Sequence, residues 1–166
     1  MKTANWTSWA AAGYAFLVTY IPGTFFFGMI WHELGHGLAC LVFGLPFQIS
    51  LTHVTTPTYP RPWVKIVVGL AGGLGEALSA LIVFGCTVWL ERLIPDQSLL
   101  KRSMFFGFEL AFLTISFQGL VAAILEGCFN ETYKQLLNNL PFWVTVCISC
   151  GILAFYILYR RSARRY

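Results

Sequence analysis

Residues 24–44 read TFFFGMIWHELGHGLACLVFG, and this stretch decides how the chain folds. At 1.5 Å per residue it is about 30 Å long as a helix, which matches the hydrocarbon core of a bilayer. Within it lie two histidines, His32 and His36, and one carboxylate, Glu33. Insertion scales put the cost of a charged group at the centre of a span at about 2.5–3.5 kcal/mol, so such groups are rarely incidental. The stretch therefore predicts a membrane helix that carries a polar site.

The composition of the whole chain supports this prediction. Of its 166 residues, 57% are hydrophobic and 11% are charged, and the mean hydropathy is +0.68. A soluble domain has about 25% charged residues. Long apolar stretches satisfy their backbone in lipid by forming helices, so we expect an all-α, polytopic membrane protein with one embedded domain over residues 1–166. The net charge of +4 does not indicate nucleic acid, because the arginines cluster in YRRSARRY at the end of the chain.

The apolar region from Trp9 to Phe43 is about 50 Å long as one helix, more than one crossing of a bilayer needs. Pro22 and Gly23 fall inside it and should kink or split it. We expect a main span over residues 23–43, preceded by a segment over residues 9–21 that is interfacial, re-entrant or a span of its own. The protein then has four spans, or five if that segment crosses. The later spans are expected at residues 64–90, 103–125 and 141–159.

Positive charge predicts the orientation. Placing the C-terminal arginines in the cytoplasm also puts the 91–102 loop there, with Arg92, Lys101 and Arg102. The 44–63 loop then faces outward, and its alternating pattern around Phe47 to Leu51 indicates a short strand or hairpin. The HELGH helix and the span over residues 103–125 both run toward the outer side, so their C-terminal halves can meet at one depth.

The spacing of the HELGH residues is that of a metal site. His32 and His36 lie one above the other on one helix face, where two imidazoles can bind one Zn²⁺ at about 2.0–2.1 Å. Glu33 lies beside them, as a general base does in zinc peptidases. The same letters on a soluble helix can simply be a solvated face, but a membrane span offers no such face.

A catalytic zinc ion needs a third protein ligand. Asp96 and Glu109 lie toward the cytoplasmic side, away from HELGH. Glu126 lies near the outward end of its span, Glu76 lies near mid-membrane, and His53 lies in the outer loop, which could fold over the site. Glu126 and Glu76 both stay open as ligands. The stretch GLAGGLGEALSA around Glu76 carries Gly69/Gly73 and Ala71/Gly75/Ser79 at four-residue spacing, which predicts close helix packing.

These motifs resemble the site-2 protease family of intramembrane zinc metalloproteases. HELGH at residues 32–36 matches the family's H-E-x-G-H. QGLVAAILEG at 118–127 has the spacing of its second motif, N-x-x-P-x-x-x-L-D-G, with Gln118 for Asn and Glu126 for Asp. GGLGE at 72–76 is similar to its G-P-x-x-N, with Glu76 for Asn.

The resemblance implies the fold, the cofactor and the residue roles. His32, His36 and Glu126 are then the Zn²⁺ ligands and Glu33 is the general base, while Gln118, Glu76 and His53 are candidates for supporting groups or for an alternative ligand. The chain then divides into an N-terminal segment (1–22), a metalloprotease-like core (23–127) and a last part with the final span and basic tail (128–166).

The implied function is hydrolysis of a peptide bond within or next to a transmembrane segment of a membrane protein in the lipid bilayer. The family's substrate-positioning Asn and Pro are replaced in this chain. The alternative is therefore a catalytically degenerate, protease-like membrane subunit that binds a partner in a larger complex.

Overall fold

The computed structural model describes residues 6–50, 53–55, 58–94 and 98–129, together with Gly151 and Tyr156. The chain forms two compact units, Met1–Asn130 and Glu131–Tyr166. In the second unit only Gly151 and Tyr156 are described, and both are helical. The rest of the predicted span from Pro141 to Tyr159 lies outside the described residues, as does the basic tail.

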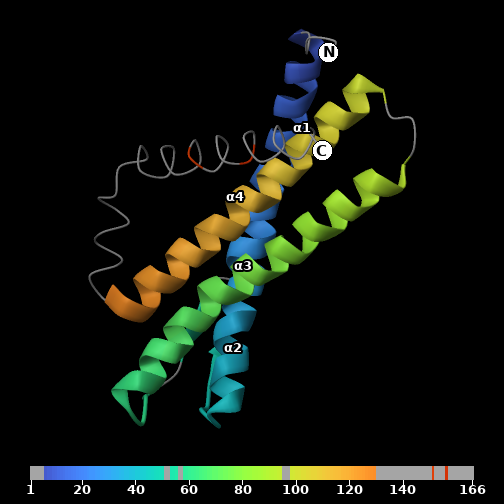
Figure 1. Ribbon diagram of the computed structural model, residues 1–166. Coiled ribbons are helices and arrows are strands. Elements are labelled where there is room, and N and C mark those ends of the chain that lie inside the picture. The colour runs from blue at the N-terminus through green and yellow to red at the C-terminus, as the bar shows by residue number, and fades with distance from the viewer. Residues whose placement is uncertain are drawn as a thin grey trace. The chain divides into compact units, whose positions relative to one another are not determined.

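The described part of the first unit is mostly helical (Figure 1). Three of its helical stretches, Trp6–Val42, Pro62–Leu93 and Leu99–Gly127, are long and apolar enough to cross a membrane, which indicates a membrane protein. The elements in chain order are α1 (Trp6–Phe25), the π-helix η1 (Phe26–Trp31), α2 (His32–Val42), β1 (Gln48–Ile49), β2 (Val54–Thr55), α3 (Pro62–Leu93) and α4 (Leu99–Phe129).

The first apolar region is one continuous helical stretch, so the split expected at Pro22 is wrong. Proline removes a single backbone donor, and hydroxyl side chains and neighbouring helices can compensate for this inside a membrane helix. Here Gly23 packs directly against Ile115 of α4, which holds the helix next to the proline. The irregular turn comes after the proline, at η1.

Helix α3 packs against α2 on one side and α4 on the other, and small residues make both contacts close. Gly69 and Gly73 face α4, whereas Gly75 faces α2 and the backbone of Ala71 meets Gly35 of that helix. The predicted stripe of small residues is thus confirmed, with its two sets on two different faces of α3. On the α4 side, the Ser116 hydroxyl also donates to the carbonyl of Ala77 at 2.9 Å.

Helix α2 ends in a glycine cap that turns the chain into a hairpin. Gly44 has φ +62°, its N–H donates to the carbonyl of Leu41, and the N–H of Leu45 donates to the carbonyl of Cys40. This is the Schellman arrangement, in which a left-handed glycine satisfies the last helical carbonyls. Strands β1 and β2 then pair antiparallel, Gln48 with Thr55 and Ile49 with Val54, which confirms the short hairpin expected in this loop.

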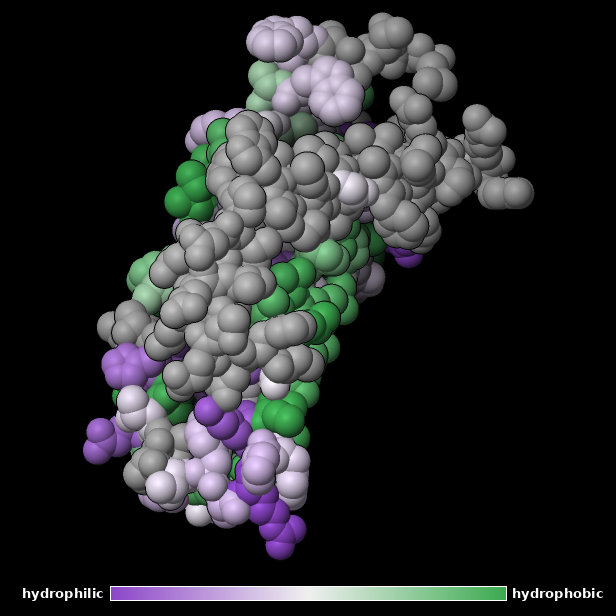
Figure 2. Space-filling view, turned by 90° about the vertical axis from the view of Figure 1, so that its left-hand side faces the viewer, coloured by the Kyte–Doolittle hydropathy of each residue, from purple (hydrophilic) through white to green (hydrophobic). Residues whose placement is uncertain are grey.

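Hydrophobic side chains cover the helices from outside. Figure 2 shows them over the middle of the coloured surface, with hydrophilic side chains gathered at the lower end, which in Figure 1 carries the hairpin and the start of α3. Leu38, Leu78 and Ile124, one from each apolar stretch, are all more than half exposed. Such outward apolar surfaces are expected of helices that contact lipid.

Candidate metal centre

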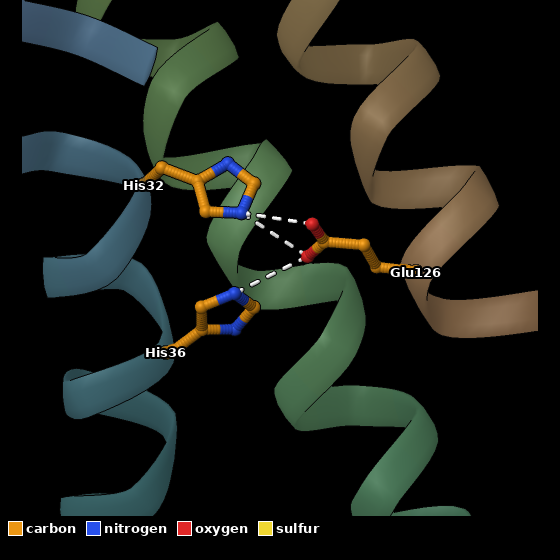
Figure 3. Close-up of side chains that lie close together, drawn as sticks. All are labelled: His32, His36 and Glu126. Atoms are coloured by element: carbon orange, nitrogen blue, oxygen red, sulfur yellow. Dashed lines mark hydrogen bonds and ion pairs between the residues drawn. The ribbon is translucent and has the colours of Figure 1, made fainter. Parts of the chain in front are cut away.

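Two histidines of α2 and one carboxylate of α4 meet beside α3 (Figure 3). His32 Nε2 lies 3.1 Å from each oxygen of Glu126, and His36 Nε2 lies 3.2 Å from Glu126 Oε2. The candidate ligand atoms of the three residues all lie within 4.8 Å of one another. The two helix halves predicted to meet therefore do meet, and they bring together the residues expected as ligands.

Gly72 of α3 makes this approach possible. A Cβ atom at Gly72 would overlap the imidazole of His36 and lie 2.8 Å from His32 Nε2. Both rings therefore rest directly on the α3 backbone. Gly69 lies nearly one turn earlier on α3: a Cβ there would lie 2.8 Å from the carbonyl oxygen of Glu126, so α4 also approaches α3 closely at this level. The two glycines let the histidines of α2 and the carboxylate of α4 meet beside α3.

The other ring nitrogen of each histidine has an acceptor as its partner. His36 Nδ1 donates to the carbonyl of Val68 at 2.7 Å, and His32 Nδ1 lies 3.3 Å from Glu76 Oε2. A carbonyl can only accept, so the proton of a neutral His36 ring lies on Nδ1. His32 lies between the carboxylates of Glu76 and Glu126, so either of its ring nitrogens, or both, can donate. Both rings direct Nε2 toward Glu126.

When both Nε2 atoms are unprotonated, they and the Glu126 carboxylate are three acceptors that repel one another unless a positive charge lies among them. A proton on Nε2 of one imidazole lets that ring donate to Glu126 but leaves the other Nε2 without a partner. A metal cation instead binds both Nε2 atoms and the carboxylate together. At zinc–ligand distances of about 2.0–2.1 Å, tetrahedral ligand atoms are about 3.3 Å apart. The spacings from Glu126 to the two imidazoles, 3.1 Å and 3.2 Å, are close to that value. The donor set therefore fits Zn²⁺.

Glu33 is next to this cluster along α2, and its carboxylate is buried. The residue is 9% exposed, and its Oε2 has no hydrogen-bond partner among the described residues. An unpaired polar atom inside an apolar bundle carries a desolvation cost of about 1–3 kcal/mol or more. Such a group can accept a proton from water or from a bound ligand.

The remaining expected site residues lie in different places. Glu76 contacts His32 through Nδ1, on the ring edge opposite Glu126, so the structure puts Glu126 and not Glu76 with both Nε2 atoms. Gln118 donates its amide hydrogen to the hydroxyl of Tyr20 on α1. His53 is exposed at the hairpin turn, 2.8 Å from the Ser50 hydroxyl. Neither Gln118 nor His53 joins the cluster.

Two contributors to the site were not expected as such. Gly72 lies in a stretch that the small-residue spacing marked for helix packing, and that spacing could have shown that another helix comes near it. Val68 contributes only its carbonyl, which every residue type possesses, so the sequence holds no signal for it.

Comparison with known proteins gave no match, whether with protein-family models, with curated proteins or with solved structures. The assignment of a function therefore depends on the motifs and on the geometry of the site.

Proposed function

We propose that the protein is an intramembrane zinc metalloprotease of the site-2 protease type. The observation that carries the proposal is the convergence of His32, His36 and Glu126, with both imidazoles oriented to present Nε2. The motif resemblance names the same three residues as ligands. The apolar helices around the site support a substrate that is itself a membrane protein.

His32, His36 and Glu126 would hold the zinc ion. When bound, zinc supplies a Lewis acid that polarises a carbonyl and makes water acidic enough to ionise near pH 7. Glu33 takes the proton of the attacking water while the oxygen adds to the scissile carbonyl carbon. As the C–N bond breaks, Glu33 returns that proton to the leaving amine nitrogen. Both actions suit a buried carboxylate oxygen with no hydrogen-bond partner among the described residues.

The placement in the membrane follows from the charge pattern. We propose four spans, with the C-terminal arginines in the cytoplasm and the hairpin on the opposite side. The metal centre then lies in the outer half of the bilayer, near the end of α4. The substrate bond lies within or next to a transmembrane segment, at the depth of this site.

The alternative is a membrane subunit that keeps the metal centre but does not cleave. The specific observation in its favour is the hydrogen bond between Gln118 and Tyr20. Gln118 stands where the family has a substrate-positioning Asn, and here its amide is engaged by α1. Such a subunit would bind a protein partner in a larger complex.

The test uses full-length protein purified in detergent and a set of synthetic peptides that each contain one transmembrane segment with flanking residues. Zinc is quantified by elemental analysis and cleavage by mass spectrometry. We expect about one zinc per chain, and cleavage that Glu33→Gln reduces about 10²–10⁴-fold while the zinc is retained. Equal cleavage by wild type and Glu33→Gln would refute the role of Glu33. Zinc without cleavage of any peptide would favour the non-cleaving subunit.

A further inference from the structure

The two histidines of the metal centre are held in different ways. His36 is held by a neutral backbone carbonyl, that of Val68, at 2.7 Å. His32 is held by a carboxylate, that of Glu76, at 3.3 Å. Both members of the second pair are buried, His32 being 8% and Glu76 6% exposed. A buried carboxylate has a high free-energy cost in a membrane span unless it has a partner, and the carboxylate of Glu76 contacts His32.

The surroundings of Glu76 fix its carboxylate at this place. Its Oε2 faces His32, and its Oε1 lies beside Gly28 of the π-helix η1, where a Cβ atom would be 3.5 Å away. Helix α3 thus points Glu76 at the segment that leads directly into His32. The carboxylate reaches the imidazole edge that faces away from the proposed metal.

A carboxylate behind a metal-binding imidazole does two things. When a metal ion is bound at Nε2, the carboxylate fixes the proton on Nδ1, so that Nε2 presents its lone pair to the metal. It also makes Nε2 a stronger electron-pair donor to the metal than a neutral hydrogen-bond acceptor at Nδ1 would. Glu76 also stops the ring of His32 from rotating. A backbone carbonyl, as at His36, fixes the proton but adds no full charge.

We propose that Glu76 is a positioning residue that orients and strengthens His32 as the stronger of the two histidine ligands. This inference rests on the metal centre of the proposed function but does not require that the protein cleaves peptides. Glu76 acts through His32 and is not itself a ligand.

The experiment measures zinc affinity by competition with a chelator of known strength, on detergent-purified full-length protein. The variants are Glu76→Gln, which keeps a neutral acceptor, and Glu76→Ala, which removes it. The matched control is Glu109→Gln, which changes another fully buried carboxylate. Glu109 precedes Glu126 by 17 residues on α4, which is about 25 Å of helix. The visible spectrum of the Co²⁺-loaded protein gives a second measurement.

We expect affinity to fall in the order wild type, Glu76→Gln, Glu76→Ala, with a total loss of about 10–100-fold. The Co²⁺ bands should shift in both Glu76 variants and stay unchanged in Glu109→Gln. Wild-type affinity and spectrum in folded Glu76→Gln and Glu76→Ala would overturn the proposal, because a purely structural role changes the yield of folded protein only.

Two further outcomes separate this inference from the proposed function. If Glu126→Ala kept zinc while Glu76→Ala lost it, Glu76 would be the ligand and the positioning role would be wrong. If wild type bound no zinc, the metal centre and this inference would both fail. If wild type bound zinc with the expected Glu76 dependence but cleaved nothing, only the protease proposal would fail.

Discussion

Gly72→Ala adds one methyl group where the two imidazoles meet the backbone of α3. The new Cβ would overlap the ring of His36 and lie 2.8 Å from His32 Nε2. Ordinary contact begins at 3.4 Å, so this nitrogen has to move by about 0.6 Å, the difference between the two distances. Metal sites hold their ligand distances to within about 0.2 Å. The methyl group therefore displaces at least one nitrogen from its binding position.

We expect Gly72→Ala to lower zinc affinity by at least about 10–100-fold, the range found when the groups that orient a ligand are disturbed. Overpacking adds a stability cost of about 1–3 kcal/mol. Chelator competition measures the affinity, and thermal unfolding in detergent measures the stability. Gly85→Ala is the matched control, because it lies on the same helix and a Cβ there meets nothing within 4 Å.

Wild-type zinc affinity in a folded Gly72→Ala protein would refute the reasoning. It would mean that the imidazoles do not rest on the α3 backbone, or that they can bind the ion from a different position. An equal loss in Gly85→Ala would show instead that the measurement responds to any added methyl group on α3.

Three other substitutions test other contacts. Glu126→Asp withdraws the carboxylate by one C–C bond, about 1.5 Å; although the resembled family has Asp here, we expect zinc affinity to fall more than tenfold in chelator competition. In Gly73→Ala the added methyl group would overlap the backbone of Ala123 and should push α3 away from α4, which lowers the free energy of unfolding by about 1–3 kcal/mol. Unchanged thermal stability would contradict the close packing. Tyr20→Phe removes the acceptor of the Gln118 amide and should cost about 0.6–1.7 kcal/mol with zinc affinity unchanged; altered zinc binding would link this pair to the metal centre.

The sequence was most informative where a residue type is costly in its surroundings. His32, Glu33 and His36 could be recognised because apolar neighbours exclude a solvated face. Helix direction made Glu126 a candidate, because the C-terminal halves of its span and of the HELGH helix were expected at one depth, but it left Glu76 open as well. The glycines of α3 were predicted to make close contacts, and the structure shows which helix each one meets.

The parts that could not be predicted depend on how each helix is rotated about its own axis and on backbone groups. The expectation that Pro22 splits the helix overestimated the effect of one missing donor, because Gly23 packs against α4 and holds the helix at this point. The position of η1 has no composition signal, since FFGMIW resembles any apolar helix. The choice between Glu76 and Glu126 depended on which imidazole edge each carboxylate reaches, and that is set by the rotation of α2.

The π-helix between α1 and α2 has a consequence for how this chain can change during evolution. Each residue of an α-helix turns the chain by about 100°, so one extra residue within a turn resets the direction of everything that follows. The α1 face toward α4 and the α2 face toward α3 therefore need not share one periodic pattern. Mutations can therefore improve the packing of α1 on α4 without changing which residues of α2 face α3. Conversely, a single-residue deletion within Phe26–Trp31 would keep all three residues of the cluster in the sequence but turn the two histidines away from Glu126.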